Sequence, residues 1–249
     1  MTAAGTGETA ALLRVAAAQP ETTPYDVAAN AQSHAAIIRA VGARVVVFPE
    51  LSLTGYHFDA PVVSPSDPRL EPLVEACRET GSAALAGAPV AGDHIGMLVI
   101  TGEDVAVAYR KIWLGDGETE RFWPGAEAAS IDIDGWRLGL AICKDTGVPE
   151  HAADTAALGI DVYVAGMLEH PADRDVISER AKRVTEDHRV WVVVASFAGS
   201  TGEGYEETAG GSAIWRPDGS RVASVGRDTG EAAVATLIRQ SETMTFPLA

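Results

Sequence analysis

One cysteine, Cys143, stands where an apolar run gives way to polar and turn residues, in Leu138-Gly-Leu-Ala-Ile-Cys143-Lys-Asp-Thr-Gly-Val-Pro-Glu150. We expect a thiol in this position to lie at the mouth of a sheet. Two other apolar runs also end on an ionisable group: Val45 to Glu50 and Val105 to Lys111. Covalent acyl chemistry needs a nucleophile, a base that takes its proton and a cation beside the developing oxyanion. A thiol, a carboxylate and an ammonium group meet these three needs.

Each of the three residues also has an ordinary structural interpretation. Free cysteine is among the most buried residue types and often behaves as a small hydrophobic side chain. Glu50 could cap a helix or lie in a solvated loop, and Lys111 could be an exposed cation at the end of a strand. The catalytic interpretation rests on the combination, because one each of Glu, Lys and Cys covers every role that the reaction requires.

Composition narrows the class of protein. The 249 residues carry a net charge of −16 at pH 7, and the 19 basic residues are scattered along the chain. Phosphate binding needs a basic surface, so the charge excludes a nucleic acid partner. Only three of the basic residues are lysines: Lys111, Lys144 and Lys182. In a chain whose usual cation is arginine, a lysine indicates a position that requires an ammonium group.

Length and a hydrophobic content of 47% indicate one large domain. We expect residues 11–249 to form it and residues 1–10, rich in Ala, Gly and Thr, to be a flexible tail. Two cysteines cannot build a disulfide framework, and the segment Met1 to Gln19 lacks the charged start and apolar stretch of a signal peptide. No apolar run approaches the roughly 20 residues that span a bilayer. These features predict a cytoplasmic protein without a membrane segment.

Apolar runs rich in β-branched residues alternate with segments of helical periodicity, which predicts an α/β fold. The expected strands include 13–18, 43–48, 83–87, 97–101, 137–142, 161–165, 190–198 and 212–215. The expected helices are 24–41, 71–80, 150–158 and 173–188. Asp134-Gly135 and Pro217-Asp218-Gly219 have the turn chemistry of hairpins. Cys77 lies on the apolar face of the second helix, so we expect it in the core.

Four segments together carry a family resemblance. They are Phe-Pro-Glu50-Leu-Ser-Leu-Thr-Gly-Tyr56, Tyr109-Arg-Lys111, Phe122-Trp-Pro-Gly125 and Gly139-Leu-Ala-Ile-Cys143-Lys-Asp145. In their order and spacing the chain resembles the nitrilase superfamily of carbon-nitrogen hydrolases along essentially its whole length. The resemblance implies a four-layer αββα sandwich, and association of the outer helices into homodimers or larger homo-oligomers.

The same resemblance implies roles for individual residues. Glu50 would be the general base, Lys111 the cation that stabilises the oxyanion and Cys143 the nucleophile, with no metal or organic cofactor. Glu118 best matches the family's additional glutamate, which orients substrate near the thiol. Glu120 is a rival, since some aliphatic amidases of the family place this glutamate closer to the following glycine.

Position 144 departs from the family pattern. After the cysteine the family usually has an aromatic residue, whereas this chain has Lys144. The ammonium group could favour the thiolate or pair with an anionic group of the substrate, and the backbone N–H is a candidate donor to the oxyanion. The side chain could equally point away and pair with Asp145 or Glu150.

Substrate selectivity is expected in loops. Tyr56 begins one such loop and Met167 begins another, so both are candidates for binding substrate, although Met167 could instead belong to the core. The histidines show no metal-ligand spacing, so no metal site is expected.

Three functions follow from the sequence and its resemblance. The first is hydrolysis of a small amide, ω-amide or N-carbamoyl compound through a thioester on Cys143, which releases ammonia or an amine and a carboxylic acid. The second is a true nitrilase, which would use the same residues on a small nitrile. The third is a non-catalytic assembly or regulatory protein on the same fold, and the intact catalytic set argues against it. An acyltransferase that uses an amine instead of water is a variant of the first.

Overall fold

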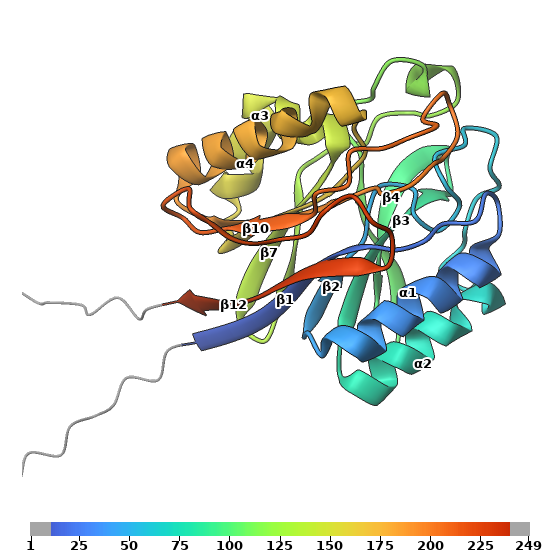
Figure 1. Ribbon diagram of the computed structural model, residues 1–249, viewed down its shortest axis with the longest axis horizontal. Helices are drawn as coiled ribbons and strands as arrows, with labels where there is room; N and C mark the ends of the chain where they lie inside the picture. The colour runs from blue at the N-terminus through green and yellow to red at the C-terminus, as the bar shows by residue number, and fades with distance from the viewer. Residues whose placement is uncertain (1–10, 240–249) are drawn as a thin grey trace, which may run out of the picture.

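The computed structural model describes residues 11–239, and within them two six-stranded β-sheets pack face to face (Figure 1). The first sheet has the order β12-β1-β2-β3-β4-β5. Its strands are β1 (Ala11–Gln19), β2 (Val45–Val47), β3 (Ala83–Val90), β4 (His94–Ile100), β5 (Val105–Arg110) and β12 (Glu231–Arg239). The second sheet has the order β11-β10-β9-β8-β7-β6. Its strands are β6 (Ala129–Ile133), β7 (Trp136–Ile142), β8 (Val162–Met167), β9 (Trp191–Ser196), β10 (Ala213–Trp215) and β11 (Arg221–Ser224).

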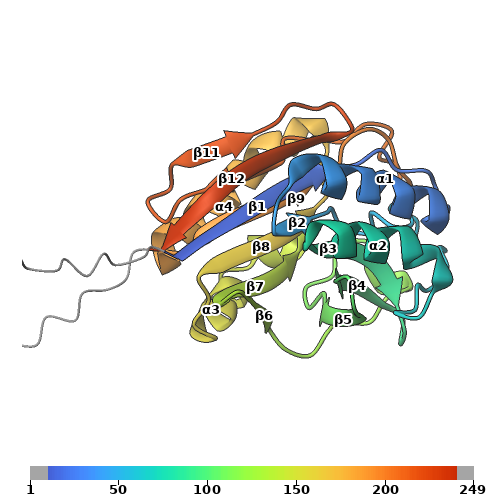
Figure 2. The ribbon, with the colours of Figure 1, turned by 90° about the horizontal axis from the view of Figure 1, so that it is seen from below.

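Helices cover the outer face of each sheet (Figures 1 and 2). They are α1 (Val27–Val41) and α2 (Glu71–Thr80) on the first sheet, and α3 (Pro149–Ala157) and α4 (Arg174–His188) on the second. The layers therefore follow the order helices, sheet, sheet, helices. This arrangement confirms the predicted four-layer αββα sandwich.

Strand β1 shows how one strand serves two cores. Leu13, Val15 and Ala17 face the second sheet, whereas Ala16 and Ala18 face the layer of α1 and α2. Because both faces of the strand are buried, its sequence is a nearly continuous apolar run rather than an alternation. Cys77 of α2 lies in the core between the helices and the first sheet, as expected.

Turns account for part of the topology. Asp134 and Gly135, whose φ angles are 51° and 78°, join β6 to β7, and residues 217–219 join β10 to β11, so both predicted hairpins are present.

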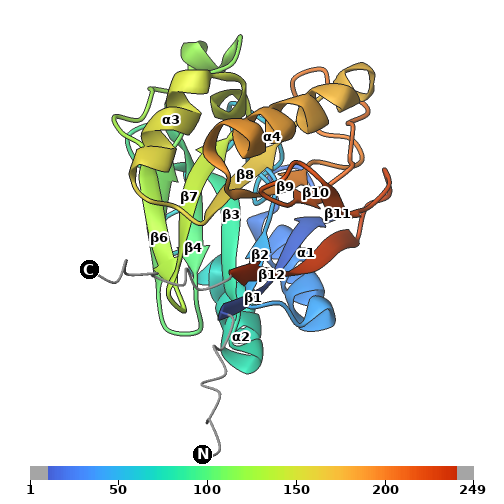
Figure 3. The same cartoon turned by 90° about the vertical axis from the view of Figure 1, so that its left-hand side faces the viewer.

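The closing strand, β12, has no clear signal in the sequence. It pairs antiparallel with β1 along its whole length and lies beside it in Figure 3. Only Ala233 and Leu237 of β12 are buried, which explains the weak hydrophobic pattern.

Within the described part of the chain, four 3₁₀ helices lie in the connections. They are η1 (Pro68–Leu70), η2 (Glu118–Glu120), η3 (Cys143–Gly147) and η4 (Pro171–Asp173). No helix within residues 11–239 is long and apolar enough to cross a membrane. The predicted flexible tail, residues 1–10, lies outside the described residues.

A buried histidine joins α1 to the segment that follows β2. The Nδ1 of His34 donates to the Asn30 carbonyl oxygen at 2.6 Å, and its Nε2 lies 2.9 Å from the Ser52 hydroxyl. Burial lowers the pKa of His34 to about 3, although the hydrogen bond to Asn30 acts in the opposite direction. The imidazole is therefore neutral near pH 7.

Acidification should destabilise the protein through His34. The unfolded chain takes up a proton near pH 6.5, whereas the folded chain resists it until about pH 3. The contribution of the neutral imidazole is complete above pH 6.5 and falls by about 2 kcal/mol between pH 7 and pH 5. In thermal unfolding the His34→Gln variant should show a flatter profile over this range than wild type or a His188→Gln control. Parallel profiles for His34→Gln and wild type would contradict this assignment.

Candidate functional site

Glu50 stands in a turn that passes between the two sheets shortly after β2. Two glycines make room for the turn. A Cβ on Gly87 of β3 would lie 2.3 Å from the Leu51 nitrogen, and a Cβ on Gly166 of β8 would lie 2.8 Å from the Phe48 carbonyl oxygen. A side chain at either position would displace the backbone that carries Glu50. The sequence thus places this carboxyl group in the interior, where it is 1% exposed.

Lys111 follows β5 and turns its ammonium group into the interior. Its backbone N–H continues the sheet by donating to the Ile95 carbonyl oxygen at 2.8 Å. Its Nζ donates to Oε1 of Glu50 and to Oε1 of Glu118, both at 2.7 Å, and all three side chains are buried. Buried charges are tolerated when they are paired and hydrogen-bonded in this way.

Glu118 begins η2 and is held from three sides. Besides Lys111, its Oε1 accepts a hydrogen bond from the Tyr56 hydroxyl at 2.6 Å, and its Oε2 accepts one from the Gly115 N–H at 2.5 Å. Glu120, its rival on sequence grounds, is exposed. The geometry therefore favours Glu118 as the additional glutamate, and it brings Tyr56 into the same group.

Cys143 is the first residue after β7. Its φ angle of 44° lies in the left-handed region, which is uncommon for a residue with a side chain and concentrates at functional sites. Its Sγ donates to the Leu168 carbonyl oxygen at 3.3 Å. Burial raises the pKa of the Cys143 thiol well above its ordinary value and Glu50 raises it further, whereas Lys111 lowers it. A thiol with so raised a pKa is neutral at rest, and it would have to give its proton to a base before it could act as a nucleophile.

Glu50 is the base that the geometry offers. Burial raises its pKa to about 8, although the neighbouring Lys111 acts in the opposite direction. A carboxyl group with a pKa near neutrality can both take up and return a proton. Its Oε1 is bonded to Lys111, while its Oε2 has no polar partner among residues 11–239. That second oxygen is available to a thiol or a substrate.

The charge of Lys111 persists despite its burial. Burial lowers the pKa of Lys111, but Glu50, Cys143 and Glu118 outweigh that effect and hold the pKa above its ordinary value. An ammonium group has three donors, and the two carboxylates occupy two of them. The third donor remains for an oxyanion in the site.

Asp145 ties the segments of Lys111 and Cys143 together, a role that the sequence does not reveal. Its carboxylate is buried. Oδ1 accepts a hydrogen bond from the Trp113 N–H at 2.8 Å, and Oδ2 accepts one from the Ile142 N–H at 2.9 Å. Trp113 is two residues from Lys111, and Ile142 directly precedes Cys143. One carboxylate therefore sets the distance between the cation and the nucleophile.

Asp145→Asn should lower kcat by about 10- to 100-fold, because a misplacement of about 1 Å can cost this much. The amide nitrogen cannot accept the backbone N–H bonds that a carboxylate oxygen accepts. Tyr109→Phe removes a single donor to Oδ2, at 2.8 Å, and should have a smaller effect. Steady-state kinetics would be compared with the melting temperature of each variant. Unchanged kcat in a folded Asp145→Asn protein would contradict the role.

A cavity of about 310 Å³ opens beside these residues. It is lined by Tyr56, Lys111, Gly115, Asp116, Glu118, Cys143, Lys144, Leu168, Glu169, Arg180 and Tyr205. Five of the seven predicted site residues are in this set, and Glu50 is hydrogen-bonded to one of them, Lys111. The structure does not bring Met167 to the cavity, since its side chain is fully buried in the core between the second sheet and α4.

Lys144 reaches the cavity from its rim. Its side chain is 46% exposed, and its Nζ lies 3.8 Å from Oδ1 of Asp116. The partner is thus Asp116 rather than Asp145 or Glu150. Among the charges that act on the thiol, the cation that lowers the pKa of Cys143 is Lys111. The geometry therefore favours a role for Lys144 toward a ligand over a role in forming the thiolate.

The loop of residues 199–208 supplies one lining residue of the cavity, Tyr205, which the sequence did not indicate. The loop reaches the turn of the other sheet, where Thr201 Oγ1 accepts a hydrogen bond from the Tyr56 N–H at 2.7 Å. The Tyr205 ring stacks on His170, with centroids 4.0 Å apart, and meets the Tyr56 ring edge-on. Aromatic contacts on two sides fix the ring over the cavity.

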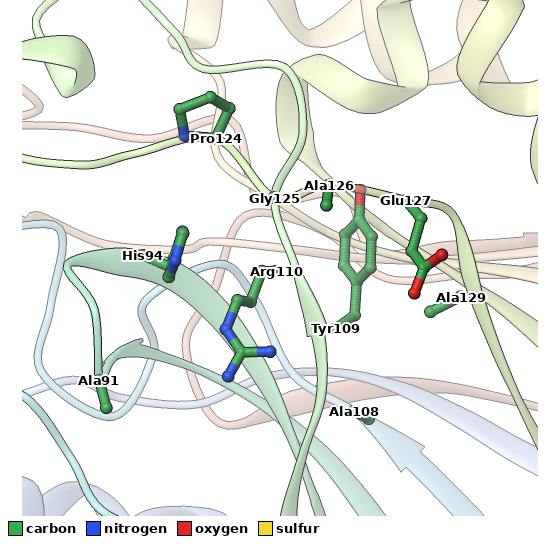
Figure 4. Close-up of a pocket in the computed structure, with 10 residues that line it drawn as sticks. All are labelled: Ala91, His94, Ala108, Tyr109, Arg110, Pro124, Gly125, Ala126, Glu127 and Ala129. Carbon is green, nitrogen blue, oxygen red and sulfur yellow. The ribbon is translucent and has the colours of Figure 1, made fainter.

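A second hollow of about 430 Å³ lies outside this group, between the β4–β5 edge and the segment that leads to β6 (Figure 4). His94, Arg110 and Glu127 are among the residues that line it. None of the seven predicted site residues does so. Among the residues that the structure describes, no group of three or more His, Cys, Asp or Glu side chains is placed to hold a metal ion. We therefore place the candidate site at the smaller cavity.

Comparison with known proteins identifies the family of the chain and proteins of similar structure. The family model described as carbon-nitrogen hydrolase matches residues 14–244. A Pseudomonas protegens protein described as a hydrolase in the pqqF 5′ region is 32% identical over 248 residues, which cover 92% of this chain and 84% of that protein. An (R)-stereoselective amidase from a Pseudomonas species is 30% identical over 197 residues, which cover 74% of this chain and 69% of that protein. A mutant of the Nesterenkonia AN1 amidase from the nitrilase superfamily has a similar structure, with a TM-score of 0.81, 20% identity and 90% coverage of each chain.

Proposed function

Since the chain belongs to the carbon-nitrogen hydrolase family, we propose that it is an amidase-like hydrolase of small, non-peptide amides. One observation carries this proposal. Glu50, Lys111 and Glu118 form a buried, hydrogen-bonded group at a cavity that Cys143 also lines. A base, a cation and a neutral thiol around one cavity are the components of covalent acyl transfer.

Acylation uses the residues as follows. Cys143 Sγ attacks the amide carbonyl carbon while its proton passes to Glu50. The oxyanion of the tetrahedral intermediate accepts hydrogen bonds from Lys111 Nζ and from the Lys144 backbone N–H. Glu50 returns the proton to the nitrogen, the C–N bond breaks, and ammonia or an amine leaves. A thioester remains on Cys143.

Deacylation reverses the proton path. Glu50 takes a proton from a water molecule, which attacks the thioester carbonyl carbon. The C–S bond breaks, the thiol of Cys143 regains a proton, and a carboxylic acid leaves. Glu118, bonded to Lys111 and Tyr56, holds the cation in place during both steps.

The relatives support amides as the substrate class. The Pseudomonas relative is described as an (R)-stereoselective amidase. A mutant of the Nesterenkonia amidase has been seen in complex with butyramide, and another mutant carries the acetamide moiety of fluoroacetamide on its active-site cysteine. Both ligands are small enough for a cavity of about 310 Å³.

The test is intact-protein mass spectrometry after brief incubation with small amides, N-carbamoyl amino acids and nitriles, together with an assay for released ammonia. We expect an adduct with the mass of the acyl group on the peptide that contains Cys143, and ammonia from the amides. A nitrile that is converted faster than its amide would instead indicate a nitrilase. No adduct and no ammonia from any compound, in a folded protein, would favour a non-catalytic role on this fold.

A further inference from the structure

Beyond the catalytic group, charged side chains share the wall of the cavity with Leu168 and the rings of Tyr56 and Tyr205. Among its lining residues only Leu168 has an aliphatic side chain. The part away from Lys111 and Glu118 carries Lys144, Arg180 and their acidic partners. A hydrocarbon acyl chain in this space would remove charged groups from water without giving them partners, which is unfavourable. The far end of the substrate should therefore be polar.

Arg180 reaches the cavity from α4 because Gly147 leaves room for it. A Cβ on Gly147 would lie 3.3 Å from Cζ and Nε of Arg180, so a larger side chain there would compete for the space of the guanidinium group. Arg180 is 24% exposed, and its Nη1 donates to Oε1 of Glu169 at 2.8 Å. A guanidinium group has five donors in a rigid plane. Glu169 fixes the orientation of that plane while using one of them.

Lys144 is the second cation, and its present partner holds it weakly. The 3.8 Å separation from Asp116 exceeds a hydrogen bond, and the Asp116 side chain is fully exposed, so a ligand can displace it at little cost. Lys144 is also adjacent in sequence to the nucleophile Cys143. Lys144 and Arg180 thus supply mobile and fixed donors, respectively, to the same cavity.

We propose that the preferred substrates are small amides that carry a carboxylate, which binds between Lys144 and Arg180 while the amide carbonyl lies at Cys143. This inference rests on the proposed amide hydrolysis. Arginine and lysine bind carboxylates through charge-assisted hydrogen bonds, and these are roughly twice as strong as neutral ones. The negative charges of Glu50 and Glu118 are balanced in part by Lys111, which limits repulsion of an anionic substrate. With a monoamide of a dicarboxylic acid the reaction consumes water, breaks the C–N bond and yields ammonia and a dicarboxylate. With an N-carbamoyl amino acid it yields ammonia and a carbamate, which breaks down to carbon dioxide and the amino acid.

Isosteric substrate pairs test the proposal. Succinamate and succinamide differ only in a terminal carboxylate or carboxamide, as do glutaramate and glutaramide, and N-carbamoylglycine extends the test to carbamoyl compounds. We expect kcat/KM to be at least about tenfold higher for the anionic member of one pair, or for N-carbamoylglycine over its amide. Lys144→Gln and Arg180→Gln should each lower kcat/KM for the anionic member much more than for the neutral member, and so remove most of this preference.

The control is Lys182→Gln, which removes an exposed positive charge from the same helix as Arg180 without touching the cavity. It should leave the preference unchanged. Equal kcat/KM for anionic and neutral members, or equal losses for both in the Lys144→Gln variant, would overturn the proposal while the amidase function stands.

Calorimetric measurement of binding to the Cys143→Ala variant tests the carboxylate site separately from the amidase function. Succinamate or glutaramate should bind this variant more tightly than the neutral amide, and Lys144→Gln should abolish the difference. If the anion preference appears in binding but no amide is hydrolysed by the wild-type protein, the amidase function fails and the carboxylate site stands. If anionic compounds are preferred neither in binding nor in kcat/KM, the carboxylate site is excluded.

Discussion

Exchange of Cys143 for alanine should abolish turnover of every amide while the protein keeps its fold. Loss of a catalytic nucleophile typically lowers kcat by on the order of 10⁴- to 10⁶-fold. Alanine has the same left-handed strain as cysteine at φ 44°, and the Sγ makes one weak bond, to the Leu168 carbonyl, so the melting temperature should change little. Ammonia release and thermal unfolding would measure the two effects.

Cys77→Ala is the matched control, because it removes the other thiol. Cys77 is 1% exposed in the core between α2 and the first sheet, and its Sγ donates to the Ile100 carbonyl oxygen at 3.5 Å. The cavity left by the thiol should lower the free energy of unfolding by roughly 1–2 kcal/mol with kcat unchanged. Equal catalytic damage from both substitutions would mean that Cys143 is not the nucleophile.

The candidate catalytic residues could be predicted because each stands where a buried strand ends. An uninterrupted apolar run indicates a strand covered on both faces, and the first ionisable residue after it marks the exit from the core. This logic located Glu50, Lys111 and Cys143. In the structure Lys111 and Cys143 line one cavity, and Glu50 is hydrogen-bonded to Lys111. It could not choose between Glu118 and Glu120, since only the bonds from Tyr56 and Lys111 distinguish the two.

Met167 shows that a strand pattern in the sequence does not determine to which side a residue at the end of the strand points. Successive side chains of a strand point to opposite faces, so a one-residue difference decides between core and cavity. Met167 ends β8 facing α4, whereas Leu168 follows it and lines the cavity. The sequence predicts a substrate-binding loop here, and its residues Leu168 and Glu169 line the cavity, but the side to which each side chain points depends on the register of β8.

The entry of Arg180 into the cavity could not be predicted from its neighbours in the sequence. On α4 it lies beside Ala181 and one turn from Ile177, both buried, and a cation in that pattern ordinarily faces solvent. Its entry into the cavity depends on the space above Gly147 and on Glu169, which come from other elements. Contacts between segments distant in sequence are set by the packing of α4 on the second sheet, and no local pattern encodes them.

Lys111→Met should have the second large effect, on activity and on stability together. Removing a donor to the oxyanion costs on the order of 10²- to 10³-fold in kcat. It also leaves Glu50 and Glu118 buried without their shared cation, a change that typically destabilises a protein by about 3–5 kcal/mol. The melting temperature should fall accordingly, whereas Lys182→Met, on the exposed face of α4, should change neither property.

The pH dependence of this destabilisation distinguishes a lost ion pair from lost packing. Burial raises the pKa of Glu50 to about 8 even with Lys111 present, and without the cation Glu50 binds its proton still more tightly in the folded state. A group whose folded pKa is raised loses stability as the pH increases, so the gap between Lys111→Met and wild type should be widest above pH 8 and narrow toward pH 5. Denaturant unfolding at pH 5 and above pH 8 measures the difference in the free energy of unfolding between the variant and wild type. A gap independent of pH would mean that Lys111 acts through its hydrocarbon stem and not through its charge.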